Sequence, residues 1–181
     1  MRTLEEQITQ YAAYHRDRRN IATHFVGVPM IVFAVILAFS VVNAPLGFTL
    51  GFTHMSVAVV LAVLTSLYYF KLDLVLGAAM AVYLAVNCFA ANEVALAVGS
   101  TNALWLALVV FVVGWVLQCW GHKFEGMKPA FFDDVMGLAI GPLFMMTEGF
   151  FMLGLKPTLR EYVEARVGPV VARRGHQTAQ T

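Results

Sequence analysis

The stretch "RNIATHFVGVPMIVFAVILAFSVV", residues 19–42, decides the fold class of this chain. After Arg19 it contains no Asp, Glu, Lys or Arg, and the charge-free run continues as far as Lys71. Lipid offers a peptide backbone no hydrogen-bond partners, so an apolar run that enters a bilayer forms a helix, in which backbone groups pair with each other. The stretch therefore predicts a membrane-spanning helix over residues 25–42.

The composition of the whole chain also indicates a membrane protein. Of its 181 residues, 60% are hydrophobic and 13% are charged, and the mean hydropathy is +0.73. Soluble domains are nearer to about a quarter charged. The net charge of +1 lacks the clustered excess of Lys and Arg that nucleic acids attract, so we expect no nucleic-acid partner.

Three further apolar runs follow the first. They cover residues 55–70, 74–92 and 103–121, and they are separated by a turn-forming segment at 43–54 and a polar segment at 92–102. The runs are long enough for roughly 24 to 28 Å of helix, close to the thickness of the hydrocarbon core. We therefore expect an all-α integral membrane bundle of four transmembrane helices.

The apolar segment 135–154 differs from the four preceding runs. Gly141 and Pro142 interrupt it and Glu148 adds a charge. We predict that it forms a C-terminal re-entrant or interfacial helical hairpin rather than a fifth span. Residues 1–157 would then form a single membrane domain, and residues 158–181 a basic, partly mobile tail.

The basic residues predict the orientation of the four spans. All twelve Lys and Arg side chains fall on one side of the four-span scheme, and none lies in segments 43–54 or 92–102. The positive-inside rule assigns that side, and with it both termini, to the cytoplasm. The membrane would be the cytoplasmic (inner) membrane in a bacterium or the endoplasmic reticulum membrane in a eukaryote.

This topology brings three of the five histidines to one boundary. His15 precedes the first span, His24 lies at its entrance, and His122 follows the fourth span. Neutral imidazole is the commonest metal ligand in proteins, and nearby Asn or carboxylate groups can support it. The histidines therefore predict a metal site at the cytoplasmic boundary.

The spacing of His15 and His24 requires a break between them. Nine residues on one continuous helix would place the two side chains on opposite faces, with a rise of about 13 Å between them. Asn20 is a good N-cap residue, so we expect a new helix to begin there. A helix-turn-helix would then fold His15 back over His24.

The fourth span carries polar residues on the same face as its histidine. Residues at a spacing of three or four lie on one helical face. Here these residues are Phe111, Trp115, Gln118, His122 and Glu125. Gly121 would allow another backbone to approach this face closely.

Two separated motifs carry a resemblance to a known family. The first is "YAAYHRDRRNIATHFVGVP", residues 11–29, with Tyr11, His15, Asn20, His24, Gly27 and Pro29. The second is "WVLQCWGHKFEGMKPAFFDD", residues 115–134, with Gln118, Gly121, His122, Glu125 and Pro129. Together they resemble the Mpo1-like family, over nearly the whole chain to about residue 157. The resemblance implies an iron(II)-dependent membrane dioxygenase of fatty acid α-oxidation, which uses O2 to convert a long-chain 2-hydroxy fatty acid to the acid one carbon shorter.

The resemblance also implies roles for individual residues. The ligands of Fe(II) would be His15, His24 and His122. The residues that orient these ligands or complete the site would be Asn20, Gln118, Glu125 and Tyr11. Separately from the resemblance, residue chemistry makes Arg18 and Arg19 candidates for binding the substrate carboxylate, because a guanidinium pairs with carboxylates. The choice of iron comes from the resemblance alone, because imidazole also binds zinc and manganese.

Non-enzymatic functions remain as alternatives. The chain could be a membrane transporter or a scaffold protein whose histidine cluster is structural. A transporter normally carries ionisable groups along the middle of its spans, and the runs described above hold almost none. Bound metal and O2 uptake on adding a 2-hydroxy fatty acid would distinguish the enzyme from both alternatives. The oligomeric state is left open.

Overall fold

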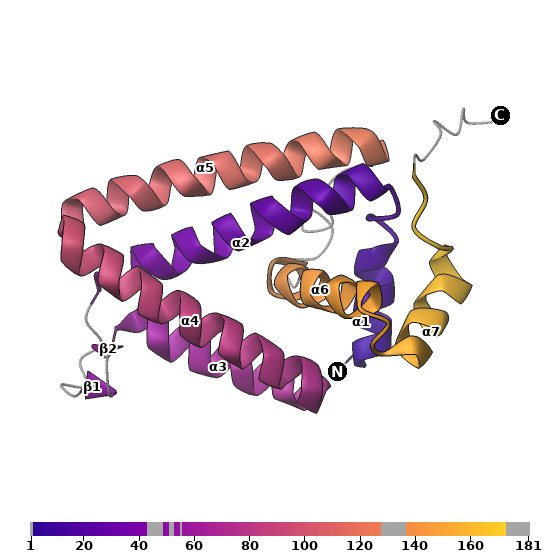
Figure 1. Cartoon of the computed structure of the whole chain (residues 1–181), viewed down its shortest axis with the longest axis horizontal. Helices are drawn as coiled ribbons and strands as arrows, with labels where there is room; N and C mark the ends of the chain where they lie inside the picture. The colour runs from indigo at the N-terminus through magenta and orange to yellow at the C-terminus, as the bar shows by residue number, and fades with distance from the viewer. Residues whose placement is uncertain (1, 43–48, 51–52, 55, 128–136, 173–181) are drawn as a thin grey trace. The chain divides into compact units, whose positions relative to one another are not determined.

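The computed structural model describes residues 2–42, 49–50, 53–54, 56–127 and 137–172, which form helices and one pair of two-residue strands (Figure 1). The helices are α1 (Leu4–Ala12), α2 (Arg18–Ser40), α3 (Val57–Leu72), α4 (Leu74–Val98), α5 (Ser100–Glu125), α6 (Gly137–Met152) and α7 (Pro157–Val167). The strands β1 (Thr49–Leu50) and β2 (Thr53–His54) pair antiparallel. The prediction of a helical body is confirmed.

Three of these helices are long and apolar enough to cross a membrane, namely α2, α4 and α5. Helix α3 is also apolar but has 16 residues. Helices α6 and α7 meet the same criterion only as a pair, and they are bent by 110° relative to each other. The described residues therefore hold three candidate spans, or four if the bent pair counts as one. The arrangement of four spans and a hairpin stays a prediction.

The segment 92–102 does not form the polar loop between two helices that its composition predicts. Helix α4 runs on to Val98 and α5 begins at Ser100, so only Gly99 stands between them. Gly99 has φ 79°, a backbone conformation that favours glycine, and its N–H donates to the carbonyl oxygen of Ala95. A single glycine therefore ends α4 where a longer polar loop was expected.

The chain divides into two compact units, residues 1–28 with 116–181 and residues 29–115. In the second unit α3 packs against α4. Asp73 is the N-cap residue of α4, because its Oδ1 accepts hydrogen bonds from the N–H groups of Val75 (3.0 Å) and Leu76 (2.8 Å). A Cβ atom at Gly77 would lie 2.8 Å from the backbone of Phe70, so glycine permits this helix contact.

The first unit is built around α1, which contacts both α6 and α7. A capping box between Thr3 and Glu6 begins α1. The buried apolar side chains of this unit include Ile8, Leu143 and Val163, one from each helix. This small core holds the end of α1 against α6 and so fixes where the following turn begins.

The prediction that Gly141 and Pro142 break the segment 135–154 is wrong. Helix α6 is continuous through Pro142, which lies near its start and removes a single backbone hydrogen bond. The chain bends later, where Gly154 (φ 73°) and Lys156 (φ 56°) adopt the left-handed conformation before Pro157 begins α7. Residues 135 and 136 of this segment lie outside the described residues.

Candidate metal centre

The turn between α1 and α2 folds His15 back toward His24. Helix α1 ends at Ala12, and the N–H of His15 donates to the carbonyl oxygen of Ala12 at 3.0 Å, which closes the turn. The Nε2 atoms of His15 and His24 lie 3.1 Å apart. The structure therefore contains the break between helices that the spacing of these two histidines requires.

The N-cap residue of α2 is Asp17. Its Oδ1 accepts a hydrogen bond from the N–H of Arg19 at 2.9 Å, and its carbonyl oxygen accepts from the N–H of Ile21 at 3.1 Å. The expectation that Asn20 caps the helix is wrong, because Asp17 is an equally good N-cap residue three positions earlier. Asn20 lies in the first turn of α2, where its side chain makes other contacts.

Three histidines converge in the first unit. The side chains of His15, His24 and His122 are buried, with exposed fractions of 0%, 1% and 6%. The ring centroids lie 4.5 Å apart for His15 and His24, 4.9 Å for His15 and His122, and 5.0 Å for His24 and His122. One ring nitrogen from each lies within 4.8 Å of the other two. Among the described His, Cys, Asp and Glu side chains, these three histidines have the geometry to hold a metal ion.

Backbone carbonyls determine the tautomers of two of the rings. Nδ1 of His15 lies 2.8 Å from the carbonyl oxygen of Tyr11, and Nδ1 of His24 lies 2.9 Å from that of Asn20. A carbonyl oxygen only accepts, so each neutral ring carries its proton on Nδ1 and a lone pair on Nε2. The two lone pairs therefore face each other, an arrangement that a cation between them would stabilise.

Burial keeps His15 neutral. Removal from water, and then the proximity of His24, lower the pKa of His15 well below its usual value of 6.5, although the hydrogen bond to Tyr11 opposes this. A neutral imidazole is the form that binds metal. The donor set therefore fits a metal ion at neutral pH.

Three buried polar atoms around the histidines have no hydrogen-bond partner among the residues that the structure describes. They are Nδ1 of His122, Oδ1 of Asn20 and Nε2 of Gln118. Buried polar atoms are normally paired. These three atoms belong to the histidine group or to residues beside it. Their lack of partners among the described residues indicates that a ligand binds here.

The carboxylate of Glu125 holds the turn that carries His15. It accepts hydrogen bonds from the backbone N–H groups of Arg16 (3.0 Å) and Asp17 (2.9 Å) and from Nδ2 of Asn20 (3.1 Å). Glu125 is 5% exposed, so these hydrogen bonds are buried. Glu125 thus ties the end of α5 to the residues that follow His15.

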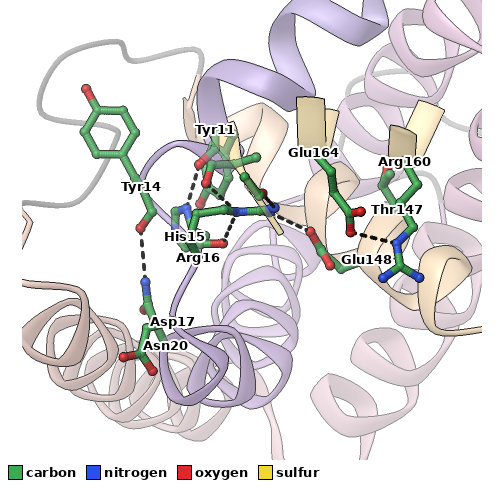
Figure 2. A network of polar contacts seen from close by, with 12 residues as sticks. Tyr11, Tyr14, His15, Arg16, Asp17, Asn20, Thr147, Glu148, Arg160 and Glu164 are labelled. Carbon is green, nitrogen blue, oxygen red and sulfur yellow. Dashed lines mark hydrogen bonds and ion pairs between the residues drawn. The ribbon is translucent and has the colours of Figure 1, made fainter. Parts of the chain in front are cut away.

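Asn20 connects this turn to His24. Its Nδ2 donates to the carbonyl oxygen of Tyr14 at 3.1 Å (Figure 2). The same Nδ2 also donates to Glu125, and the carbonyl oxygen of Asn20 lies 2.9 Å from Nδ1 of His24. A Cβ atom at Gly121 would overlap with Oδ1 of Asn20 and Oγ1 of Thr23. Glycine therefore allows the start of α2 and the end of α5 to approach closely beside His122. Pro129 of the second motif lies outside the described residues.

Tyr11 contacts His15 through its ring and its backbone. The two rings stack with centroids 4.4 Å apart and planes 3° from parallel, and Phe144 packs against Tyr11 with a centroid distance of 4.9 Å. The hydrogen bond to His15 is made by the carbonyl oxygen of Tyr11, whereas its hydroxyl lies against Gly141. Tyr11 therefore fixes both the plane and the tautomer of the His15 ring.

The two candidate carboxylate-binding arginines differ in their surroundings. The guanidinium of Arg19 is bound to Asp17, with Nε 3.0 Å from Oδ1 and Nη2 2.7 Å from Oδ2, and it lies over the ring of Phe124. Arg18 is exposed and lines a cavity of about 280 Å³ in the first unit. Their role toward a substrate stays a prediction.

The sequence did not identify Arg16 and Glu148 as partners. Arg16 is 4% exposed and Glu148 is 6% exposed, and Nη2 of Arg16 donates to Oε1 of Glu148 at 3.0 Å (Figure 2). Burial lowers the pKa of Arg16, and Glu148 opposes that shift. A glutamate inside an apolar segment signals that a buried partner exists. It does not indicate which basic residue, 132 positions away, that partner is.

Known proteins match this chain over most of its length. The family model for Mpo1-like proteins, described as 2-hydroxy-palmitic acid dioxygenase Mpo1-like, matches residues 1–153. The 2-hydroxy-palmitic acid dioxygenase MPO1 of Saccharomyces cerevisiae is 31% identical over 163 residues, which cover 89% of this chain and 87% of the yeast protein. No solved structure matches the chain. The predicted resemblance is therefore confirmed, and the chain belongs to the Mpo1-like family.

Proposed function

We propose that this chain is an iron(II)-dependent dioxygenase of fatty acid α-oxidation, which converts a long-chain 2-hydroxy fatty acid to the fatty acid one carbon shorter. The named activity of the yeast relative supports the substrate class. The observation that carries the metal part of the proposal is the pair of facing Nε2 atoms of His15 and His24, 3.1 Å apart, with His122 beside them.

The proposed net reaction balances without a further reductant. The bond between C1 and C2 of the 2-hydroxy acid breaks, C2 becomes the carboxyl carbon of the shorter acid, and C1 leaves as CO2. The four electrons released reduce one O2, and the remaining oxygen atom leaves as water. Iron(II) held by His15, His24 and His122 would supply the electron transfer that O2 chemistry requires.

The side chains would act as ligands and as supports. In this proposal His15, His24 and His122 hold the iron through their ring nitrogens, and no carboxylate belongs to this group of described potential ligands. The carbonyl oxygens of Tyr11 and Asn20 keep the Nδ1 protons of His15 and His24 in place, so that the Nε2 lone pairs stay available. Glu125 and Asn20 orient the turn, and the unpaired Nε2 of Gln118 offers a hydrogen-bond donor to the bound ligand.

Arg18 is the better candidate for the substrate carboxylate. Arg19 is already bound to Asp17 on two atoms, whereas Arg18 is exposed at a cavity. A guanidinium can bind a carboxylate with two parallel hydrogen bonds. The acyl chain would remain in the lipid phase around the apolar helices.

The remaining parts of the proposal concern the membrane. We place both termini in the cytoplasm, in the cytoplasmic membrane of a bacterium or the endoplasmic reticulum membrane of a eukaryote, because of the distribution of Lys and Arg. The division into a domain at 1–157 and a tail at 158–181 also stays a prediction. The apolar helices α2, α4 and α5 support the membrane location itself.

Product analysis tests the proposed reaction. Detergent-solubilised protein is incubated with 2-hydroxypalmitate, ferrous iron and O2, and the fatty acids are identified by mass spectrometry. We expect pentadecanoic acid and one O2 consumed per product, and no reaction with palmitate, which lacks the hydroxyl group. Unchanged 2-hydroxypalmitate with an iron-loaded protein would contradict the proposal and favour a structural histidine cluster in a transporter or scaffold.

A further inference from the structure

A segment near the C-terminus is hydrogen-bonded to the turn that carries His15. The N–H of Val171 donates to the carbonyl oxygen of Arg16 at 2.8 Å, and the N–H of Arg18 donates to that of Val171 at 2.9 Å. These bonds form a parallel bridge between Asp17 and Val171. The carbonyl oxygen of Gly168 also accepts a hydrogen bond from Nη1 of Arg16 at 3.1 Å. We name residues 168–171 the C-terminal strap.

The strap holds Arg16, the residue directly after His15. Nε of Arg16 donates to the carbonyl oxygen of His15 at 2.9 Å (Figure 2) and to that of Ala12 at 3.0 Å, so the side chain of Arg16 also stabilises the turn. Its N–H is bound by Glu125 and its Nη2 by Glu148. The strap supplies the acceptor for Nη1 and the donor for the backbone carbonyl of Arg16.

Helix α7 carries the strap to this place. Leu159 and Val163 are buried, and α7 contacts α1, which leads into the same turn. Gly168 (φ 78°) ends α7 in a conformation that favours glycine and redirects the chain. The strap is therefore positioned by packed residues that precede it.

We propose that the C-terminal strap is a positioning element for His15 in metal binding. The inference rests on the proposed metal site, and it concerns residues beyond the 1–153 that match the family model. A metal ligand binds tightly only when its ring is held in the right orientation by partners outside the metal's own ligands. The strap binds both the backbone carbonyl and the guanidinium of Arg16. It thereby holds in place the peptide that joins Arg16 to His15.

Two truncated chains test the strap. A chain that ends at Val167 lacks the strap, and a chain that ends at Ala172 keeps it and lacks only residues 173–181. Co²⁺ serves as the probe, because its visible spectrum reports the geometry of its ligands. We expect the chain that ends at Val167 to bind Co²⁺ about tenfold more weakly, with a changed visible spectrum. We expect the chain that ends at Ala172 to match the full chain in both.

Hydrogen exchange of the metal-free protein gives a second readout. In the chain that ends at Val167, we expect faster exchange at the amides of Arg16, Asp17 and Arg18, which surround the lost hydrogen bonds. A strap that only adds stability would lower the melting temperature and leave the Co²⁺ spectrum of the folded protein unchanged. That result would overturn the positioning role.

A point variant covers the case in which truncation prevents folding. Val171→Pro removes the N–H that donates to Arg16, and Ala172→Pro is the matched control one residue later. We expect weaker Co²⁺ binding only in Val171→Pro. Equal Co²⁺ affinity, spectrum and exchange in all chains would overturn the strap proposal but leave the metal site intact. Absence of Co²⁺ binding in the full chain would overturn the metal site, and the strap's role with it.

Discussion

The Nε2 atoms of His15 and His24 lie 3.1 Å apart, while Nδ1 of each ring is already bonded to a backbone carbonyl oxygen. In these tautomers neither Nε2 carries a proton, so the contact joins two acceptors inside a buried site. Two acceptors at this distance are stabilised by a cation that both can bind. The relationship between these two side chains is therefore the basis of the proposed metal centre.

Replacing any one of the three histidines should abolish tight metal binding. We expect His15→Ala, His24→Ala and His122→Ala each to weaken the binding of Fe²⁺ or Co²⁺ by roughly 100-fold, since each ligand contributes on the order of 3 kcal/mol. Metal titration of the purified proteins measures this. His176→Ala, at a histidine outside the described residues, is the control and should bind like the unchanged protein. Full metal retention in all three variants would contradict the ligand assignment.

Glu125→Gln should destabilise the turn. The carboxylate accepts from the N–H groups of Arg16 and Asp17 and from Nδ2 of Asn20, and an amide would place a donor against one of these donors. We expect a loss of about 2 to 4 kcal/mol in the free energy of unfolding, because buried donors lose a charged acceptor. Thermal unfolding in detergent measures it. The exposed Glu161→Gln on α7 serves as control, and equal melting temperatures for the two variants would argue against this role.

Gly121→Ala should push α2 and α5 apart beside His122. The new Cβ would overlap with Oγ1 of Thr23 and Oδ1 of Asn20, so we expect a loss of stability of about 1 to 3 kcal/mol together with weaker metal binding. Gly149→Ala in α6 is the matched control, since its Cβ would meet only Cε1 of Phe25 at 4.0 Å. That control should be neutral or stabilised by up to about 1 kcal/mol. A Gly121→Ala protein as stable as the control would show that the helices are not in close contact.

The metal-free protein should lose stability in mild acid. The pKa of His15 lies well below 6.5 in the folded state and near 6.5 in the unfolded state. Between these values the unfolded state binds more protons, so the free energy of unfolding rises with pH. The contribution of His15 is complete above about pH 7.5 and is lost as the pH falls below about 6.5. Melting temperatures measured from pH 8 to pH 5 should show this decrease, with a smaller slope in His15→Gln. A flat profile would mean that His15 titrates normally.

Much of the helical body could be predicted from hydropathy, because the backbone groups of a charge-free run in lipid must hydrogen-bond to one another, as they do in a helix. The errors lie at boundaries. Asp17 and Asn20 are equally good caps, so the sequence alone could not choose between them. Gly99 alone ends α4, whereas α6 continues through Pro142. The sequence could not predict either result, because a single Gly or Pro does not determine how many hydrogen bonds a helix can lose.

The candidate site shows the same limit. The convergence of His15, His24 and His122 could be expected from topology, since the four-span scheme places all three at one membrane boundary. The residues that hold these histidines in place could not be predicted from the topology. Arg16 binds Glu148 and Gly168 at separations of 132 and 152 residues, and no local pattern predicts such pairs. Arg19 is a candidate for the substrate carboxylate in the sequence, and the structure binds its guanidinium to Asp17, two positions earlier.

X-ray absorption of the iron-loaded, reduced protein tests the central claim most directly, because it counts the nitrogen ligands around the metal. We expect one Fe²⁺ per chain with scattering from three imidazole rings, and one ring fewer in His24→Ala. Iron surrounded by oxygen ligands alone, with the same spectrum in the full chain and in His24→Ala, would contradict the claim that these three histidines hold the metal.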